Sequence, residues 1–545
     1  RHIDHLAESV HTRLVPVRGW TPSEKPEIIL SDQTDSANGS ATAVPLNTIR
    51  LYLTAPDDLS PLGDVDDWYL ALLTHEYTHI LHADHTTGLA ALGNSVLGKS
   101  FAPNMVQPHW ILEGLAIYLE STRTGGGRLR SSLWNMYLRA DVLEHNVASL
   151  DQFTNTPRRW PQGNLWYLYG SFFVRWIAET YGEDIFRAVI ADYGNRPIAY
   201  GVNRSMRRAT GRTYEDLYPA WIATLQRDFG AQADAIRARG LREGQRLTHT
   251  GQVLQKPRFI PRGTWPSAQG DLLYFVDDAH STPGLYRLPL ERSPQGDITH
   301  IGDRELLVRT NGVSTASFTP DGDLVFSSVD YHNNLFAFTD LHKLAAGARS
   351  PRGLEGNRVR LTDGFRASDP DVSPDGRRVV FVTNHRGTSY LQVADITDHQ
   401  GIQGVRALVR SERFDQAYSP RWSPDGTHVV YGVWTRGGYR DLRLVDTRDG
   451  TYVELTHDRA IDGGPSFSPD GKWVFYHSDR TGVANVYARE VSTGTVKQVT
   501  NVLTGAFQPE VSADGKTLAY VGYTSRGFDL YAMRLDPTRW LEPLP

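Results

Sequence analysis

Cysteine is absent from all 545 residues of the chain. Its absence excludes disulfides and thiolate metal ligands, so a metal site must be built from histidine, aspartate and glutamate. Long apolar runs are also missing, because no stretch reaches the roughly 18 residues that a membrane-spanning helix needs. The formal net charge is only -5 and no long basic run occurs. We therefore expect no nucleic-acid partner and no membrane span.

The length and composition predict a multidomain globular protein. A chain of 545 residues is too long for one ordinary core, and 40% hydrophobic with 22% charged residues is typical of soluble domains. The chain opens at RHIDHLAESV, which has no signal-like apolar segment. Together with the missing cysteine, this leads us to expect an exported bacterial protein, periplasmic or extracellular, whose signal peptide has been removed.

A metal-binding motif lies in the apolar stretch DWYLALLTHEYTHILHADH. There His75, Glu76 and His79 form an HExxH pattern. Residues four apart lie on one face of a helix, so both imidazoles can hold the same ion. Zinc in a hydrolytic site takes three protein ligands and leaves one position for water, and Glu76 is placed to act as general base and acid on that water. The pattern predicts a zinc-dependent hydrolase that lacks only its third ligand.

Two residues compete for the position of third ligand. Glu113 lies in the phrase WILEGLA on a later predicted helix, where a lone carboxylate among apolar residues is costly unless it is paired or bound to metal. His85 occupies the third position of a metzincin-like HExxHxxGxxH pattern, but that pattern needs Gly where this chain has His82. We expect the helix to continue until Gly88, which favours Glu113 and leaves His82 and His85 at a solvated or supporting helix end.

The pair HEYTH and WILEGLAIYLE resembles the gluzincin zinc metallopeptidases. The resemblance covers most of residues 65–185 and implies a mostly helical, thermolysin-like α+β domain over residues 1–240. It also implies that His75, His79 and Glu113 bind Zn2+ as sole cofactor. A tyrosine on the helix after the glutamate helix would then steady the oxyanion, as Tyr167 or Tyr169 in LWYLYGSFF. The alternative is that both tyrosines simply pack in an aromatic-rich helix.

Other segments of the first domain have simpler interpretations. We expect β-strands at residues 27–30 and 48–54, separated by a polar loop, with a strand beside the metal helix to pair with an extended peptide. The glycine run at residues 125–127 with Arg128 is interpreted as a connector between helices, with a flexible active-site loop as the alternative. It is not a phosphate loop, because no phosphate-binding pattern accompanies it. Residues 165–239 show helical periodicity.

An internal repeat begins after residue 240. Six turn signals recur at residues 267–271, 319–322, 373–376, 423–426, 468–471 and 512–515. Their glycines are 52, 54, 50, 45 and 44 residues apart, a period typical of four-stranded propeller blades. We expect a six-bladed propeller over residues 241–538, in which residues 244–249 close the last blade, followed by a tail at 539–545. The SPDG turns and LT strand starts resemble TolB-type propellers.

The sequence leaves three functions open. The first is a zinc peptidase that hydrolyses peptide bonds through a metal-activated water, with the propeller selecting or gating a peptide or protein substrate. The second is an envelope protein-binding module whose propeller docks a protein partner, with a non-catalytic or latent zinc domain. The third is a zinc amidase or esterase, which would use the same residues. The aspartates of the propeller turns are interpreted as turn formers rather than metal ligands.

Overall fold

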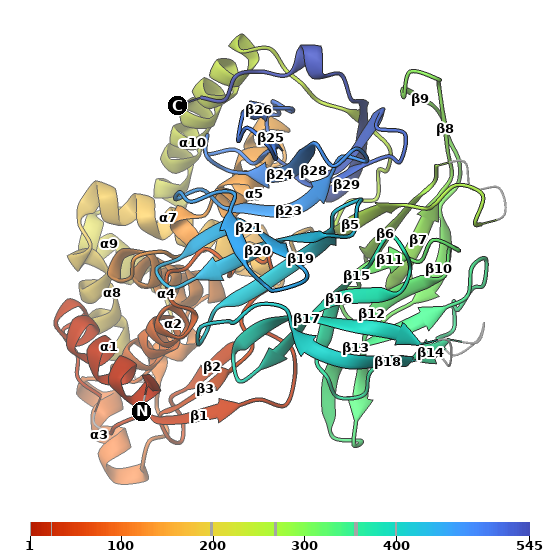
Figure 1. Ribbon diagram of the computed structural model, residues 1–545. Coiled ribbons are helices and arrows are strands. Elements are labelled where there is room, and N and C mark those ends of the chain that lie inside the picture. Colours follow the sequence, from red (N-terminus) through yellow and green to blue (C-terminus); the bar gives the residue numbers. More distant parts are fainter. Residues whose placement is uncertain are drawn as a thin grey trace. The chain divides into compact units, whose positions relative to one another are not determined.

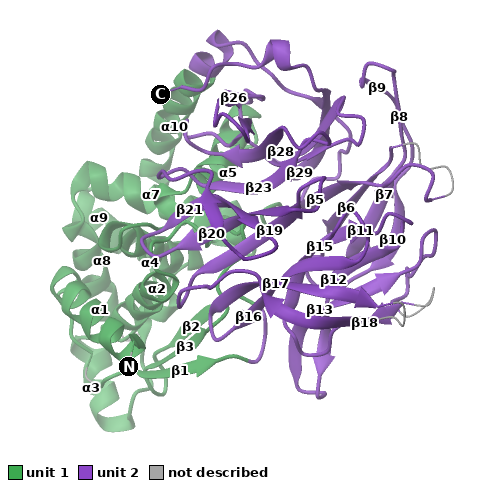
Figure 2. Cartoon of the chain, in the orientation of Figure 1, with its two compact units in different colours: residues 1–32, 36–233 green, residues 33–35, 234–545 purple. Residues whose placement is uncertain are grey.

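The computed structural model describes residues 2–22, 24–196, 200–265, 270–353, 358–397 and 401–544. It divides into two compact units, residues 1–32 with 36–233 and residues 33–35 with 234–545 (Figure 2). This confirms a multidomain chain with a helical N-terminal region and propeller-like sheets. The division falls within helix α10, so the predicted boundary at residue 240 stays a prediction. Within the described ranges, no helix is both long and apolar enough to cross a membrane.

The first unit is mostly helical, with one small sheet (Figure 1). Its elements are α1 (His2–Arg18), β1 (Glu27–Ser31), β2 (Gly39–Thr42), β3 (Thr48–Tyr52), α2 (Trp68–Ala83), α3 (Gly88–Leu97), α4 (His109–Arg123), α5 (Ser132–Leu143), α6 (Leu150–Thr154), α7 (Asn164–Tyr181), α8 (Asp184–Gly194), α9 (Val202–Thr210) and α10 (Tyr214–Ala238). Short 3₁₀ turns at Pro103–Val106 and Arg128–Arg130 join some of these helices.

Helix α2 carries the HExxH motif and is buried on almost every side. Its N-cap Asp67 accepts hydrogen bonds from the backbone N–H groups of Tyr69 and Leu70 at 2.9 and 3.0 Å, which satisfies two free donors of the first turn. Buried apolar side chains line the rest of the helix. A helix that is hydrophobic all round belongs in a core, so tertiary packing holds the motif rigidly.

Helices α4 and α7 pack closely because of two glycines. A Cβ on Gly114 would lie 2.6 Å from the backbone of Gly170, and one on Gly170 would lie 2.2 Å from the carbonyl oxygen of Trp110. Either clash would push the helices apart. Since α4 also packs on α2, this close approach fixes how residues of α4 and α7 face the HExxH motif.

Two segments outside the predicted strands and helices contain regular elements. The polar loop after β1 includes β2, which pairs antiparallel with β3 (Gly39 opposite Leu51), while β1 pairs parallel with β3. The sheet order β1-β3-β2 therefore puts β2 at an edge. The region between residues 86 and 108 includes α3. Strand β2 has no apolar alternation that predicts a strand, whereas α3 has Leu89, Leu92 and Val96 at the spacing that predicts a helix.

The second unit contains, within its described residues, six four-stranded sheets that form the propeller blades and one further two-stranded sheet. From the first strand of each blade outward, the strands are β5 (Val253–Phe259), β6 (Leu272–Asp277), β7 (Gly284–Leu288), β10 (Glu305–Arg309); β11 (Ala316–Phe318), β12 (Leu324–His332), β13 (Phe336–Leu344), β14 (Val359–Arg360); β15 (Ala367–Val372), β16 (Arg378–His385), β17 (Thr388–Thr397), β18 (Gly401–Ala407); β19 (Gln416–Trp422), β20 (His428–Thr435), β21 (Tyr439–Asp446), β22 (Tyr452–Glu454); β23 (Asp462–Phe467), β24 (Trp473–Ser478), β25 (Asn485–Glu490), β26 (Val496–Gln498); and β27 (Ala506–Val511), β28 (Thr517–Thr524), β29 (Gly527–Arg534), β4 (Gln245–Arg246). The two-stranded sheet pairs β8 (Leu290–Arg292) with β9 (Ile298–Ile301).

The ring is closed by an upstream strand. The first strands of successive blades contact one another, and β27 contacts β5. The sixth blade takes β4 as its outer strand, with Arg246 opposite Tyr531. This pairing covers an edge that would otherwise be free. The tail from residue 539 is attached to the fifth blade, because Leu541 forms a bridge with Gln498.

The repeated turns share one hydrogen-bond pattern. In the SPDG turn of the third blade, the Ser373 hydroxyl lies 2.5 Å from Oδ1 of Asp375, and Gly376 has φ +72°. The turns at residues 423–426, 468–471 and 512–515 repeat this pattern. Glycine adopts the left-handed conformation without strain, which explains the recurring Asp-Gly. Residues 266–269, which include part of the first turn signal, lie outside the described residues.

The innermost strands place buried charged side chains around the propeller axis. Lys256 of the first blade lies 3.0 Å from the Ser419 hydroxyl of the fourth blade, on the opposite side of the ring. Arg421 forms an ion pair with Glu510 at 2.7 Å, and Arg258 approaches the same carboxylate at 3.5 Å. Side chains that meet across the ring fill its centre, so the axis at this level is not a passage for a polypeptide.

Candidate metal centre

Three potential ligand atoms converge on one point. His75 Nε2 lies 3.2 Å from His79 Nε2, and Glu113 Oε2 lies 3.3 and 3.2 Å from these two nitrogens. The edges of a tetrahedron with zinc–ligand bonds of about 2.0–2.1 Å measure about 3.3–3.4 Å. Glu113 Oε2 is buried and contacts both imidazole nitrogens without an aligned hydrogen bond to either, an arrangement that suits a shared cation. The residues therefore fit a zinc ion held by His75, His79 and Glu113.

The charges of the site suit this role. Burial opposes ionisation, but the two imidazoles hold the pKa of Glu113 well below its ordinary value, so Glu113 is a carboxylate. Burial and Arg128 act against protonation of His75, yet contacts with Glu113 and Glu120 and the charge of Glu76 raise its pKa to about 9. A metal ion must displace that proton on binding.

Glu76 lies beside the cluster but is not one of its converging ligands. It is 5% exposed, and burial raises its pKa against the lowering effect of His75 and His79. A Cβ on Gly39 would lie 2.7 Å from Glu76 Oε1, so edge strand β2 passes directly over this carboxylate. The carboxylate of Glu76, a candidate general base, therefore lies next to edge strand β2, whose backbone can pair with an extended chain.

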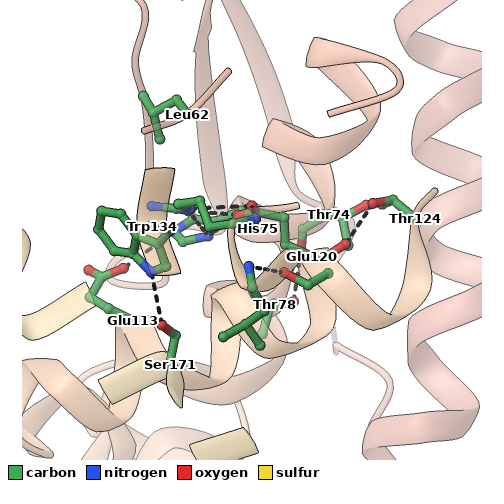
Figure 3. A network of polar contacts seen from close by, with 12 residues as sticks. Leu62, Thr74, His75, Thr78, Glu113, Glu120, Thr124, Trp134 and Ser171 are labelled. Atoms are coloured by element: carbon green, nitrogen blue, oxygen red, sulfur yellow. Dashed lines mark hydrogen bonds and ion pairs between the residues drawn. The ribbon is translucent and has the colours of Figure 1, made fainter. Parts of the chain in front are cut away.

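A buried polar network supports His75 from the side opposite its ligand nitrogen. His75 Nδ1 lies 3.1 Å from Glu120 Oε2 and 2.8 Å from Arg128 Nη2 (Figure 3 shows His75 with Glu120). Arg128 Nη2 donates to Glu120 Oε2 at 2.6 Å. Although burial opposes it, Arg128 and His75 lower the pKa of Glu120 to about 2. A carboxylate at Nδ1 fixes the ring orientation and leaves Nε2 for a metal.

The two candidate tyrosines of α7 have different environments. The Tyr167 ring lies 6.4 Å from the His75 ring. Burial and the carboxylates of Glu113 and Glu76 raise the pKa of Tyr167, which keeps its hydroxyl protonated as a donor. The fully buried Tyr169 instead donates to Asp141 at 2.7 Å and accepts from the backbone N–H of Ala148 at 2.9 Å. The structure thus brings Tyr167 to the cluster, whereas Tyr169 packs in the core.

The end of α2 differs from the prediction. The helix ends at Ala83 rather than continuing to Gly88, where α3 begins. His85 nevertheless does not join the ligand cluster; its ring stacks on Trp20 at 4.4 Å, and burial and the charge of Arg18 lower its pKa to about 4. His82 is only 1% exposed, so it is not a solvated helix end.

Sequence reasoning missed Glu120 and Arg128. Both are buried and contact His75, although the glycine run before Arg128 was interpreted as a connector. The signal for Glu120 is its spacing from Glu113: seven residues is two helical turns, which puts both carboxylates on the same face of α4. Arg128 had no comparable signal, because it reaches the site through a turn.

Tyrosine substitutions separate the two environments. If the chain is the zinc peptidase that the sequence predicts, with Tyr167 as its oxyanion donor, Tyr167→Phe is expected to lower kcat of peptide hydrolysis about 10²-fold with metal content unchanged. Tyr169→Phe is expected to leave kcat nearly unchanged and to lower the free energy of unfolding by about 1–3 kcal/mol, because Asp141 and Ala148 lose their partner. Peptide kinetics and urea unfolding on both variants measure these effects. Equal losses of kcat in the two variants, or a larger loss in Tyr169→Phe, would show that the assignment of Tyr167 as oxyanion donor is wrong.

Comparisons with known proteins concern the propeller and peptidases. The TolB β-propeller domain family (PD40) matches residues 368–541. An uncharacterised protein of Agrobacterium fabrum is 32% identical over 114 residues, 21% of this chain and 38% of that protein. "Uncharacterized peptidase YuxL" of Bacillus subtilis is 28% identical over 162 residues, 23% of this chain and 24% of that protein. The chain thus matches well under half the length of these relatives.

A solved structure adds one further similarity. A puromycin-hydrolyzing peptidase of Mycobacterium tuberculosis is 12% identical, with a TM-score of 0.37, over 56% of this chain and 57% of that one. The candidate zinc site is inferred from the residues of this chain and the distances between them, not from these relatives. Residues 368–541 match the TolB β-propeller domain family, and these blades follow a helical region in which two histidines and a glutamate converge.

Proposed function

We propose that the chain is a gluzincin-like zinc peptidase. The observation that carries the proposal is the convergence of His75, His79 and Glu113 at the spacing of a tetrahedral zinc site, with Glu76 beside them. Zinc held there would polarise a peptide carbonyl and lower the pKa of water from about 15.7 to about 7. An intact Glu76 favours catalysis, because a purely structural zinc site has no need of it.

The chain's own residues supply the remaining steps. Glu76 takes a proton from the attacking water and later gives it to the leaving amine. The Tyr167 hydroxyl donates a hydrogen bond to the oxyanion of the tetrahedral intermediate. Edge strand β2 would hold the substrate by backbone pairing, and its Gly39, which has no Cβ, lets β2 itself lie against Glu76. These roles serve peptides as well as other amides or esters, and the similarity to the uncharacterized peptidase YuxL favours peptides.

The propeller is proposed to select substrates that are small or extended. We also propose that the protein is exported. Because Lys256 and Ser419 meet across the axis, selection would act at the propeller surface rather than by threading through the ring. Cleavage of unfolded proteins together with resistance of their folded forms is the expected pattern. If folded and unfolded forms are cleaved equally, size selection is excluded.

Metal analysis combined with a peptide-library screen tests the peptidase proposal. After dialysis, elemental mass spectrometry is expected to give about one zinc per chain. Library hydrolysis is expected to stop when a chelator removes the metal and to return when zinc is added. Hydrolysis that persists without metal would overturn the zinc mechanism. A zinc-loaded protein that cleaves neither peptides nor small esters would favour the binding-module function, in which the propeller docks a protein partner.

A further inference from the structure

Arg128 is a charged side chain that lies beside the proposed zinc ligands and makes several hydrogen bonds there. It follows the glycine run that leaves α4, and it is 6% exposed. Its backbone N–H and its Nε donate to Glu120 Oε1 at 3.1 and 3.3 Å, and its Nη2 donates to Glu120 Oε2. Three donors on one carboxylate leave Glu120 a single orientation.

The glycines before Arg128 make this return possible. A Cβ on Gly126 would lie 2.7 Å from the backbone of Val65, and one on Gly127 would lie 2.6 Å from the backbone of Ser121. Gly127 also has φ +109°, a conformation that other residues rarely adopt. Only glycines let the chain turn tightly enough for Arg128 to reach back to Glu120, one residue from Ser121 on α4. The glycine run thus places the Arg128 guanidinium next to Glu120 and His75.

Arg128 also contacts the two aromatic rings that the proposed reaction uses. Its Nη2 lies 2.8 Å from His75 Nδ1, and its guanidinium carbon lies 5.4 Å from the centre of the Tyr167 ring. The rings of His75 and Tyr167 are inclined by 23°. A planar guanidinium can lie against an aromatic face while its fork holds a carboxylate. A lysine ammonium offers neither the fork nor the planar face.

We infer that Arg128 is a positioning residue that holds His75, through Glu120, and Tyr167 in fixed relative orientation. When His75 binds a metal through Nε2, its Nδ1 is protonated and donates a hydrogen bond to the Glu120 carboxylate. Arg128 is a donor only, so it acts on His75 by fixing the Glu120 carboxylate. The part of this inference that concerns Tyr167 rests on the proposed peptidase function. The part that concerns His75 rests on metal binding alone.

A charge-neutralising role is the competing explanation. A buried Glu120 needs a positive partner whatever the site does, and breaking a buried ion pair on one side costs several kcal/mol. Arg128→Lys keeps the charge and removes the fork and the stacking. A double variant, Arg128→Met with Glu120→Gln, removes both charges together and guards against misfolding of the single one. Arg130→Lys is the matched control, because Arg130 is exposed and, among the described residues, donates to the Gly125 carbonyl alone.

The readouts are cobalt binding, the visible spectrum of the cobalt-loaded protein, and peptide kinetics. We expect Arg128→Lys and the double variant to fold, to bind Co2+ about 10–100-fold more weakly and to show an altered visible spectrum. We also expect kcat to fall about 10-fold or more with little change in KM, since positioning acts in the transition state. Arg130→Lys should match the unaltered protein.

The outcomes separate the two proposals. Unchanged cobalt affinity, spectrum and kcat in either folded variant would reduce Arg128 to a neutralising partner of Glu120 and overturn the inference. If the unaltered protein binds cobalt but cleaves nothing, the peptidase proposal fails. Weaker cobalt binding in Arg128→Lys would then still establish the positioning of His75. If the unaltered protein binds no metal at all, both proposals fall.

Discussion

Glu76→Gln is expected to lower kcat of peptide hydrolysis about 10²–10⁴-fold while the protein keeps about one zinc per chain. Glutamine has nearly the same shape as glutamate but cannot take a proton from water at neutral pH. Glu76 is not among the three converging ligand atoms, so the metal site should survive. Elemental mass spectrometry and kinetics on one peptide measure the two quantities on the same preparation.

The matched control is Glu179→Gln on α7. Glu179 is exposed and, within the part of the chain that the structure describes, pairs with Arg175 four residues earlier on the same helix and with no other cation. Exposed pairs of this kind contribute little to stability, so this variant should behave like the unaltered protein. Hydrolysis at the normal rate in Glu76→Gln would show that another group activates water. Loss of zinc from Glu76→Gln would mean instead that Glu76 is a ligand.

Removing the third ligand is expected to have the second large effect. Glu113→Ala leaves two imidazoles, and a two-ligand site should lose its zinc during dialysis, together with all measurable hydrolysis. His85→Ala should keep both, because His85 stacks on Trp20 and lies outside the ligand cluster. Zinc analysis of the two variants beside the unaltered protein decides between the gluzincin and metzincin assignments.

Folding must be checked before the zinc values are compared. Glu113 is a half-buried carboxylate whose removal leaves His75 and His79 facing each other, so Glu113→Gln provides a second, nearly isosteric test. Circular dichroism and urea unfolding should be similar for all variants. Retention of zinc by both Glu113 variants together with its loss from His85→Ala would reverse the assignment of the third ligand.

The sequence predicts those parts of the site that lie on long periodic helices. His75 and His79 share a helix face by spacing alone, and Glu113 is conspicuous as a lone carboxylate in an apolar phrase. For the oxyanion donor, the sequence indicates α7 but leaves Tyr167 and Tyr169 both open. For the two histidines and Glu113, local periodicity determines both the element and the direction of the side chain.

The rest depends on tertiary packing that no local pattern records. Strand β2 consists of the small residues GSAT, and its strand conformation comes from pairing with β3. Helix α2 ends at Ala83 without a glycine, so the expected stop at Gly88 was wrong. Arg128 belongs to a glycine-rich turn, where a charged residue normally faces solvent. Only the return of the chain toward α4 buries it.

The propeller axis has a consequence for how the second unit loses its structure. In repeat arrays whose units touch only their neighbours, terminal units can detach one at a time. Here Lys256 in blade one meets Ser419 in blade four, and Glu510 in blade six is shared by Arg421 and Arg258. Detaching any of these blades would leave buried charges without partners. Unfolding of the propeller is therefore cooperative, because non-adjacent repeats are coupled directly rather than through the intervening ones.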